Sequence, residues 1–170
     1  MRDRTSQSRL QRIQENNMTN IGRNMNAVHF LESCSNGKLD EVRSALARGE
    51  DVNTKDCFGH TALMQAVLNR HNSIVKLLLD QPGVKANERN NYGGANCGST
   101  ALHLAVQYNN PEGARMLLLH VGMNSANSTD FHDDTAVVFA VRLRMKEVLR
   151  ELVRHESVNL DVPEGFFGER

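Results

Sequence analysis

The sequence GHTALMQAVLNRHNSIVKLLL, residues 59–79, recurs in similar form as GSTALHLAVQYNNPEGARMLL in residues 98–118. A third stretch, DDTAVVFAVRLRMKEVLRELV in residues 133–153, matches these two more loosely. The upstream stretch FLESCSNGKLDEVRSALARGEDVN, residues 30–53, fits the same template without its opening turn. Self-similarity of this kind indicates a repeat architecture, so the sequence predicts a stack of four units.

Each unit places its apolar residues in two short blocks with helical spacing, which predicts a helix, a turn and a second helix. Thr61, Thr100 and Thr135 each stand just before the first block. A hydroxyl at that position can accept a hydrogen bond from the free amides of the opening turn, so these threonines are predicted N-caps. Neither helix could bury its apolar face alone, and neighbouring units must therefore stack around a continuous core.

The start of the helical units carries a recognisable signature: TALM at 61–64, TALH at 100–103 and TAVV at 135–138, while GEDVN at 49–53 ends the first unit. With these motifs the chain resembles the ankyrin-repeat family, whose unit is a β-turn finger followed by two antiparallel helices with a Thr-Pro-Leu-His signature. The resemblance covers about residues 26–161. It implies an all-α fold, a right-handed solenoid of stacked helix-turn-helix units with β-turn fingers.

The resemblance also implies a division of the chain into an N-terminal arm, a repeat region and a tail. Residues 1–25 are expected to be a helical or disordered arm, and residues 26–161 an ankyrin-repeat domain. Residues 162–170 are expected to be the start of a truncated further repeat, or a tail, in a longer array. Within the domain we expect repeats at about residues 26–55, 56–87, 88–127 and 128–161.

The sequence departs from the family pattern at a few places. Residues 88–97 hold about five extra residues, which should lengthen that finger. Arg70, Asn109 and Arg144 occupy the turn between the two helices of a unit, where the family favours glycine, and Asp133 replaces a finger glycine. We expect all four residues to adopt positive φ, at the cost of slight strain for the arginines.

Composition excludes several classes of function. Lys and Arg together number 20, as do Asp and Glu, so no whole-molecule charge favours nucleic acid or an anionic membrane. The longest wholly apolar run, residues 136–141, is far too short to span a bilayer, and no membrane association is expected. The three cysteines form neither an even framework nor a CxxC pair, which favours reduced thiols in the cytoplasm or nucleus.

No pattern of catalytic or metal-ligating residues is found, and we expect no enzyme activity, no cofactor and no metal. The histidines are spread over the repeats without metal-ligand spacing, and Cys57 with His60 would supply only two of the ligands that zinc needs. No phosphate-binding loop or nucleophile elbow occurs. By the resemblance, His103 is a structural residue that hydrogen-bonds near Thr100.

The resemblance implies that a protein or peptide partner meets the finger tips and the exposed side of the inner helices, on the concave face. Large aromatic side chains on the fingers could anchor such a partner, or could instead pack on their own or the next finger. Carried over by position, the candidate partner-binding residues are Phe58, His60, Leu68, Asn69, Tyr92, Asn96, Gln107, Tyr108, Phe131, His132 and Arg142.

The sequence therefore predicts a protein–protein interaction module, an adaptor, scaffold or regulatory segment that is monomeric on its own. The alternative is binding of nucleic acid or an anionic ligand through a basic fourth repeat and the N-terminal arm. Glu147 and Glu151 interleave with the basic residues, and an acidic finger lies beside them, so this alternative is disfavoured. The basic residues are Arg142, Arg144, Lys146, Arg150 and Arg154; the acidic finger holds Asp130, Asp133 and Asp134.

Overall fold

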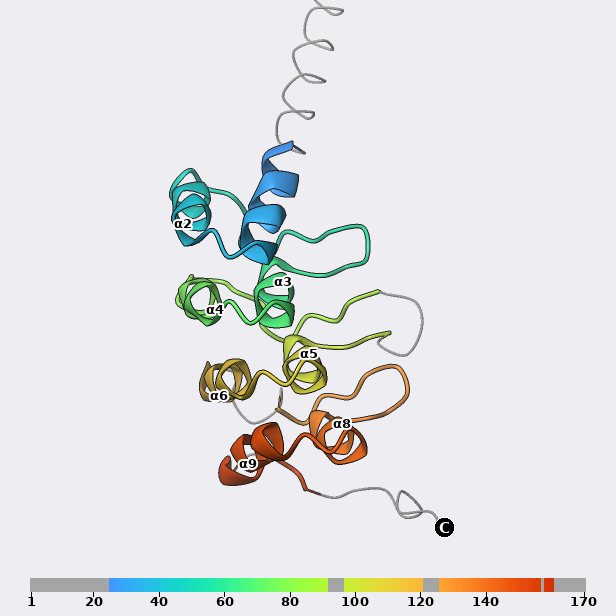
Figure 1. Cartoon of the computed structure of the whole chain (residues 1–170). Coiled ribbons are helices and arrows are strands. Elements are labelled where there is room, and N and C mark those ends of the chain that lie inside the picture. The colour runs from blue at the N-terminus through green and yellow to red at the C-terminus, as the bar shows by residue number, and fades with distance from the viewer. Residues whose placement is uncertain (1–24, 92–96, 121–125, 157, 161–170) are drawn as a thin grey trace, which may run out of the picture.

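The computed structural model of the chain describes residues 25–91, 97–120, 126–156 and 158–160. These residues form helix pairs arranged in two layers, with an inner helix and an outer helix in each pair (Figure 1). The inner helices are residues 25–35, α3 (Ala62–Leu68), α5 (Ala101–Gln107) and α8 (Ala136–Arg142). The outer helices are α2 (Leu39–Ala47), α4 (Asn72–Leu79), α6 (Pro111–His120) and α9 (Lys146–Arg154).

The predicted all-α solenoid is confirmed. Within the described ranges the only β pairing consists of two isolated bridges, Lys55 with Thr61 and Thr129 with Thr135, each at the base of a loop that leads into an inner helix. The predicted arm and tail lie outside the described residues, apart from residue 25.

Threonine side chains start the inner helices as predicted. Thr61 has extended backbone angles and its hydroxyl oxygen accepts a hydrogen bond from the amide of Met64 at 3.2 Å. Thr135 does the same for Val138 at 3.4 Å. These bonds satisfy amides that the helix leaves free. They therefore fix where α3 and α8 begin and where the loops before them end.

The turns within each helix pair contain the positive φ angles that the sequence predicts. Arg70, Asn109 and Arg144 have φ of 59°, 49° and 56°, and Gly37 has 75° at the same place in the first pair. In each of the last three pairs the following amide bonds back to the inner helix, as His71 does to the carbonyl of Ala66 at 2.9 Å. A residue in the left-handed region therefore ends each inner helix and reverses the chain.

The core is continuous along the stack. Helix α3 packs against α4 and α5, α5 packs against α6 and α8, and α6 packs against α4 and α9. The apolar residues of the signature blocks are buried between the layers, including Leu63 and Leu102 of the inner helices and Leu78, Leu117 and Leu152 of the outer ones. Each helix pair therefore buries its apolar faces against its neighbours, as a repeat protein requires.

Candidate partner-binding surface

Loops project from the inner helices on the side away from the outer helices, and we call them fingers (Figure 1). The three fingers comprise residues 54–61, 88–100 and 129–135. At the base of each finger, an Asp or Asn forms a backbone hydrogen bond across the loop. The amide of Asp56 donates to the carbonyl of His60 at 3.0 Å, and Asp130 bonds to Asp134 in the same way at 3.0 Å. Asn90 occupies the equivalent position and its amide bonds to the carbonyl of Ser99 at 3.0 Å.

Successive fingers are joined by backbone hydrogen bonds. The amide of Asn91 donates to the carbonyl of Phe58 at 2.9 Å, and the amide of Phe131 donates to the carbonyl of Cys97 at 3.1 Å. The approach is close enough to require glycine, since a Cβ added to Gly98, where φ is 77°, would lie 2.6 Å from the Phe131 ring. The described parts of the fingers therefore form one connected row, whose backbone is held by these bonds before any partner binds.

Three of the predicted aromatic residues lie at the surface. Phe58 is 49% exposed and Phe131 is 56% exposed, both on fingers, and Tyr108 at the end of α5 is 45% exposed. The guanidinium carbon of Arg89 lies 5.8 Å from the centroid of the Phe131 ring, and the Phe58 ring lies 6.3 Å from that of His60. The three residues keep about half of their surface accessible, although Phe58 and Phe131 also have neighbours within the chain.

Other predicted site residues contribute to the fold as well as to the surface. Leu68 is half-buried and packs against the core, and Gln107 is half-buried. Asn69 is exposed, but its side chain donates to the hydroxyl of Ser35 at 3.1 Å. His60 lies 3.3 Å from a carboxylate oxygen of Asp56 through its Nδ1. These contacts link neighbouring inner helices or brace a finger.

The remaining predicted residues fall in or near the last two fingers. His132 is exposed. Arg142 forms an ion pair with Asp134 at 2.6 Å while its guanidinium lies 5.7 Å from the centroid of the Phe139 ring. Tyr92 and Asn96 lie outside the described residues.

His103 is a structural residue, as the resemblance implied. Its side chain is 1% exposed, and its Nδ1 lies 3.2 Å from the Thr100 amide and 2.8 Å from the Thr100 hydroxyl. Its Nε2 lies 3.0 Å from the carbonyl of Asp134, which belongs to the next repeat. Burial lowers the pKa of this imidazole, while the hydrogen bond to Asp134 acts in the opposite direction. The neutral ring with a proton on Nε2 satisfies all of these contacts.

The acidic finger predicted in the fourth repeat is only partly a solvated surface. Asp130 is 1% exposed, and its Oδ1 accepts from the amides of His132 at 2.8 Å and Asp134 at 3.0 Å. Placing Asp130 on an acidic surface was therefore wrong, because an Asp at the base of a finger turns inward to accept backbone amides. Asp133 does occupy the predicted left-handed position, with φ of 61°.

Carboxylates neutralise much of the basic region on the last two helices. Arg150 pairs with Glu147 at 2.8 Å and Arg154 with Glu151 at 2.9 Å, in addition to the pair that Arg142 makes on the inner helix. The arginine of each pair is exposed, so each pair adds little stability. They do reduce the net positive charge that this region could offer to a phosphate.

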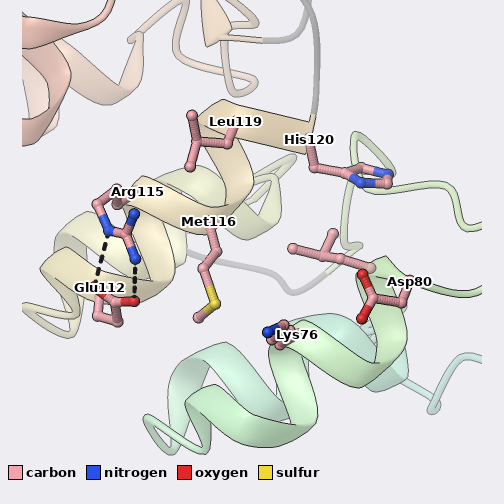
Figure 2. A pocket seen from close by; sticks show the side chains of 8 residues that line it. Lys76, Asp80, Glu112, Arg115, Met116, Leu119 and His120 are labelled. Carbon is pink, nitrogen blue, oxygen red and sulfur yellow. Dashed lines mark hydrogen bonds and ion pairs between the residues drawn. The ribbon is translucent and has the colours of Figure 1, made fainter.

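A hollow of about 380 Å³ lies between the outer helices α4 and α6, away from the fingers. Figure 2 shows Met116 and Leu119 within a rim of charged side chains, with Lys76 and Asp80 on one side and the ion pair of Arg115 with Glu112 on the other. The positive and negative groups of this rim balance. Substitutions on this outer face, at Lys76 or Arg115, can therefore serve as controls for substitutions on the fingers.

Two further observations concern the described ranges. No group of three or more His, Cys, Asp or Glu side chains within them is arranged to hold a metal ion. None of the helices in these ranges combines the length and the apolar composition that crossing a membrane requires.

Stacked helix pairs with fingers on one side define a class of repeat protein, the solenoid, in which each unit contacts only its neighbours. Comparison with known proteins identifies the particular family. A sequence profile described as ankyrin repeats (3 copies) matches residues 25–130 and 82–164. The chain belongs to the ankyrin-repeat family.

Individual relatives match parts of the chain. It is 47% identical to the human mitochondrial disaggregase over 50 residues, which are 29% of this chain and 7% of that protein. It is 60% identical to human protein phosphatase 1 regulatory subunit 12B over 37 residues, 22% of this chain and 4% of the relative. A fowlpox virus protein named for ankyrin repeats is 29% identical over 132 residues, 75% of this chain and 36% of the relative. The chain thus spans well under half the length of these relatives.

Proposed function

We propose that this chain is a protein–protein interaction module, acting as an adaptor, scaffold or regulatory segment, which binds a protein or peptide on the concave surface formed by the fingers and inner helices. One observation carries the proposal: Phe58, Tyr108 and Phe131 stay about half exposed on backbone that hydrogen bonds already hold. Large aromatic side chains supply much of the energy of protein interfaces, and a preformed backbone lowers the entropy cost of binding.

The comparisons support the regulatory part of this proposal. One relative, 60% identical over 37 residues, is by its name a regulatory subunit of a protein phosphatase. Family membership supports protein partners in general, while the choice of surface rests on the aromatic side chains.

We also propose that the chain acts as a monomer in the cytoplasm or nucleus. The described thiols are compatible with a reducing compartment: Cys34, Cys57 and Cys97 are all free, and Cys57 is exposed. Burial raises the pKa of the Cys34 thiol to about 12, which makes that side chain an unreactive part of the core.

Nucleic acid binding through the fourth repeat is the weaker alternative. A phosphate-binding surface needs cations that are available to the phosphates, and three arginines of that repeat are paired with carboxylates. Steep weakening of partner binding with added salt would favour this alternative over an aromatic-anchored contact.

The test is a selection from a random peptide library on the folded protein, followed by titration of one selected peptide. Phe58→Ala, Tyr108→Ala and Phe131→Ala should each weaken its binding about thirtyfold, because each removes a buried anchor worth about 2 kcal/mol. Lys76→Ala on the outer face should leave the affinity unchanged. Circular dichroism confirms that each variant is folded. Equal affinities for all four variants, or no recovered peptide, would contradict the proposal.

A further inference from the structure

Arg89 is a candidate binding residue that sequence reasoning missed. It lies at the start of the lengthened finger, where the repeat pattern is interrupted, and its equivalence to Lys55 of the previous finger is the one sequence signal that points to it. The guanidinium of Arg89 lies 5.8 Å from the centroid of the Phe131 ring. That ring lies against Gly98, and the Phe131 amide is bonded to the carbonyl of Cys97 at 3.1 Å. The aromatic surface beside Arg89 is therefore fixed by the contact between two fingers.

Among the described residues the same arrangement occurs once more, with a carboxylate added. Arg142 lies 5.7 Å from the centroid of the Phe139 ring, and its guanidinium also pairs with Asp134 at 2.6 Å. Arg89 takes part in none of the ion pairs formed among the described residues. An arginine held beside an aromatic ring keeps several N–H donors at the edge of its plane, where a carboxylate can be bound.

Arg89 lines a hollow in which positive side chains predominate, whereas the finger that carries Phe131 holds Asp130, Asp133 and Asp134. Arg89 shares this open hollow of about 740 Å³ with Lys55, Lys85 and Glu88, and Glu88 is the one acidic side chain among the described residues that line it. Glu88 is already engaged, since one of its oxygens lies 2.7 Å from Lys55 Nζ and the other 3.7 Å from Lys85 Nζ. The hydrogen bond from Lys55 is the main cause that lowers the pKa of Glu88, so this carboxylate stays charged and leaves the hollow with an excess of positive charge.

We infer that the partner is an acidic peptide segment, in which an Asp or Glu carboxylate binds Arg89 and an adjoining large apolar side chain packs on Phe131. This inference rests on the proposed function and names the chemistry of the partner. The carboxylate from the peptide takes the place at Arg89 that Asp134 takes at Arg142. Lys55 and Lys85 lie across the hollow and favour further acidic residues in the segment.

The experiment uses the random peptide library on three proteins: the wild type, Arg89→Gln, and Arg115→Gln as a matched control that removes one charge from the outer face. Peptides selected on the wild type and on Arg115→Gln should be enriched in Asp and Glu relative to the input library, and those selected on Arg89→Gln should be clearly less enriched. A selected acidic peptide should bind Arg89→Gln at least about tenfold more weakly than the wild type.

A second peptide, in which Gln and Asn replace Glu and Asp, completes a double-mutant cycle. The neutral peptide should bind the wild type and Arg89→Gln equally, because it has no carboxylate with which Arg89 could interact. Selected peptides that depend on the three aromatic residues but show no acidic enrichment and ignore Arg89→Gln would overturn this inference and leave the proposed function standing. Peptides that ignore the aromatic substitutions would contradict the proposed function itself. Tighter Arg89-dependent binding of a single-stranded oligonucleotide than of the acidic peptide would overturn the inference in favour of a phosphate backbone.

Discussion

The second and third repeats share one backbone plan but hold their fingers with different polar groups. In the second repeat Asp56 accepts from the amides of Phe58 at 2.9 Å and His60 at 2.8 Å, and its other oxygen accepts from the side chain of Gln65 at 2.8 Å. In the third repeat Asn90 accepts from the amide of Ser99 at 2.9 Å. The Nδ2 of Asn90 and the hydroxyl of Ser99 are buried without a hydrogen-bond partner among the described residues.

The third repeat has an additional polar contact on its inner helix. Where the second repeat has Met64, the third has His103, which binds Thr100 of its own repeat and the carbonyl of Asp134 in the next one. The second repeat thus secures its own finger through Asp56, whereas the inner helix of the third repeat also bonds to the finger of the fourth. The polar support of a finger can therefore come from the loop itself or from the inner helix of the preceding repeat.

The largest expected effect tests whether both repeats share one core. Leu63 and Leu102 occupy equivalent buried positions. Truncating either to Ala removes buried methyl groups and leaves a cavity, so Leu63→Ala and Leu102→Ala should each lower the free energy of unfolding by about 2 to 5 kcal/mol. Urea unfolding measures both, with exposed Arg115→Ala as a control near zero. A large cost in one repeat and none in the other would show that the core is not continuous.

The next largest effect tests the difference between the second and third repeats at His103. His103→Met gives the third repeat the residue of the second, removes the contact with Thr100 and takes away one of the two donors to the Asp134 carbonyl, which keeps the amide of Asp130. We expect a loss of about 1 to 3 kcal/mol in unfolding free energy near neutral pH. An unchanged stability would mean that the bond between the third and fourth repeats contributes nothing.

The contribution of His103 to stability is also predicted to depend on pH, and the same variant tests this. Because burial lowers the pKa of His103 in the folded state, the unfolded chain takes up a proton below about pH 6.5 that the folded protein does not. Stability should therefore fall as pH falls through that range, by at most about 1.4 kcal/mol per pH unit from this group. Unfolding in urea at about pH 7.5 and about pH 5.5 should show a steeper loss for the wild type than for His103→Met. Parallel losses would contradict this assignment, since the remaining histidines are common to both proteins.

A smaller effect concerns the turns within the helix pairs. Arg144 adopts φ of 56°, a region in which a side chain costs about 1 kcal/mol relative to glycine. Arg144→Gly should raise the free energy of unfolding by about this amount, and Arg144→Ala, which keeps the Cβ, should not. Thermal melting of the two variants side by side separates backbone strain from loss of the charged side chain.

The smallest effect concerns the lengthened finger. Deleting residues 92–96 joins Asn91 to Cys97 and gives the third repeat the finger length of the second. Because loop length changes the closure entropy only slowly, the free energy of unfolding should shift by no more than about 0.6 kcal/mol. A loss as large as that of Leu102→Ala would show that the insertion supports the fold.

The helix pairs, their threonine caps and the positive φ angles at Arg70, Asn109, Asp133 and Arg144 could all be predicted from the sequence, because each depends on a residue and its near neighbours in the chain. The insertion could be located only to residues 88–97. The hydrogen bonds narrow it to 92–96, since Asn90 and Asn91 take the places of Asp56 and Cys57.

Contacts between repeats were not predictable in the same way. The burial of Asp130 depends on amides that only the folded finger presents, and the position of Arg89 beside Phe131 depends on two fingers that are distant in sequence. The residues chosen for partner binding therefore remain a prediction. The structure narrows this choice, because it shows which of them are exposed aromatic residues and which, such as Leu68, pack against the core.

The hydrogen bonds between fingers offer a way to follow motion along the array. The amides of Asn91 and Phe131 each donate across a boundary between repeats, whereas the amides inside a helix donate within it. Hydrogen–deuterium exchange at these two amides requires neighbouring fingers to separate, but not the helices to unfold. Their exchange rates would therefore report how often each boundary opens. Slower exchange at one of them on addition of a ligand would show which pair of fingers the ligand holds together.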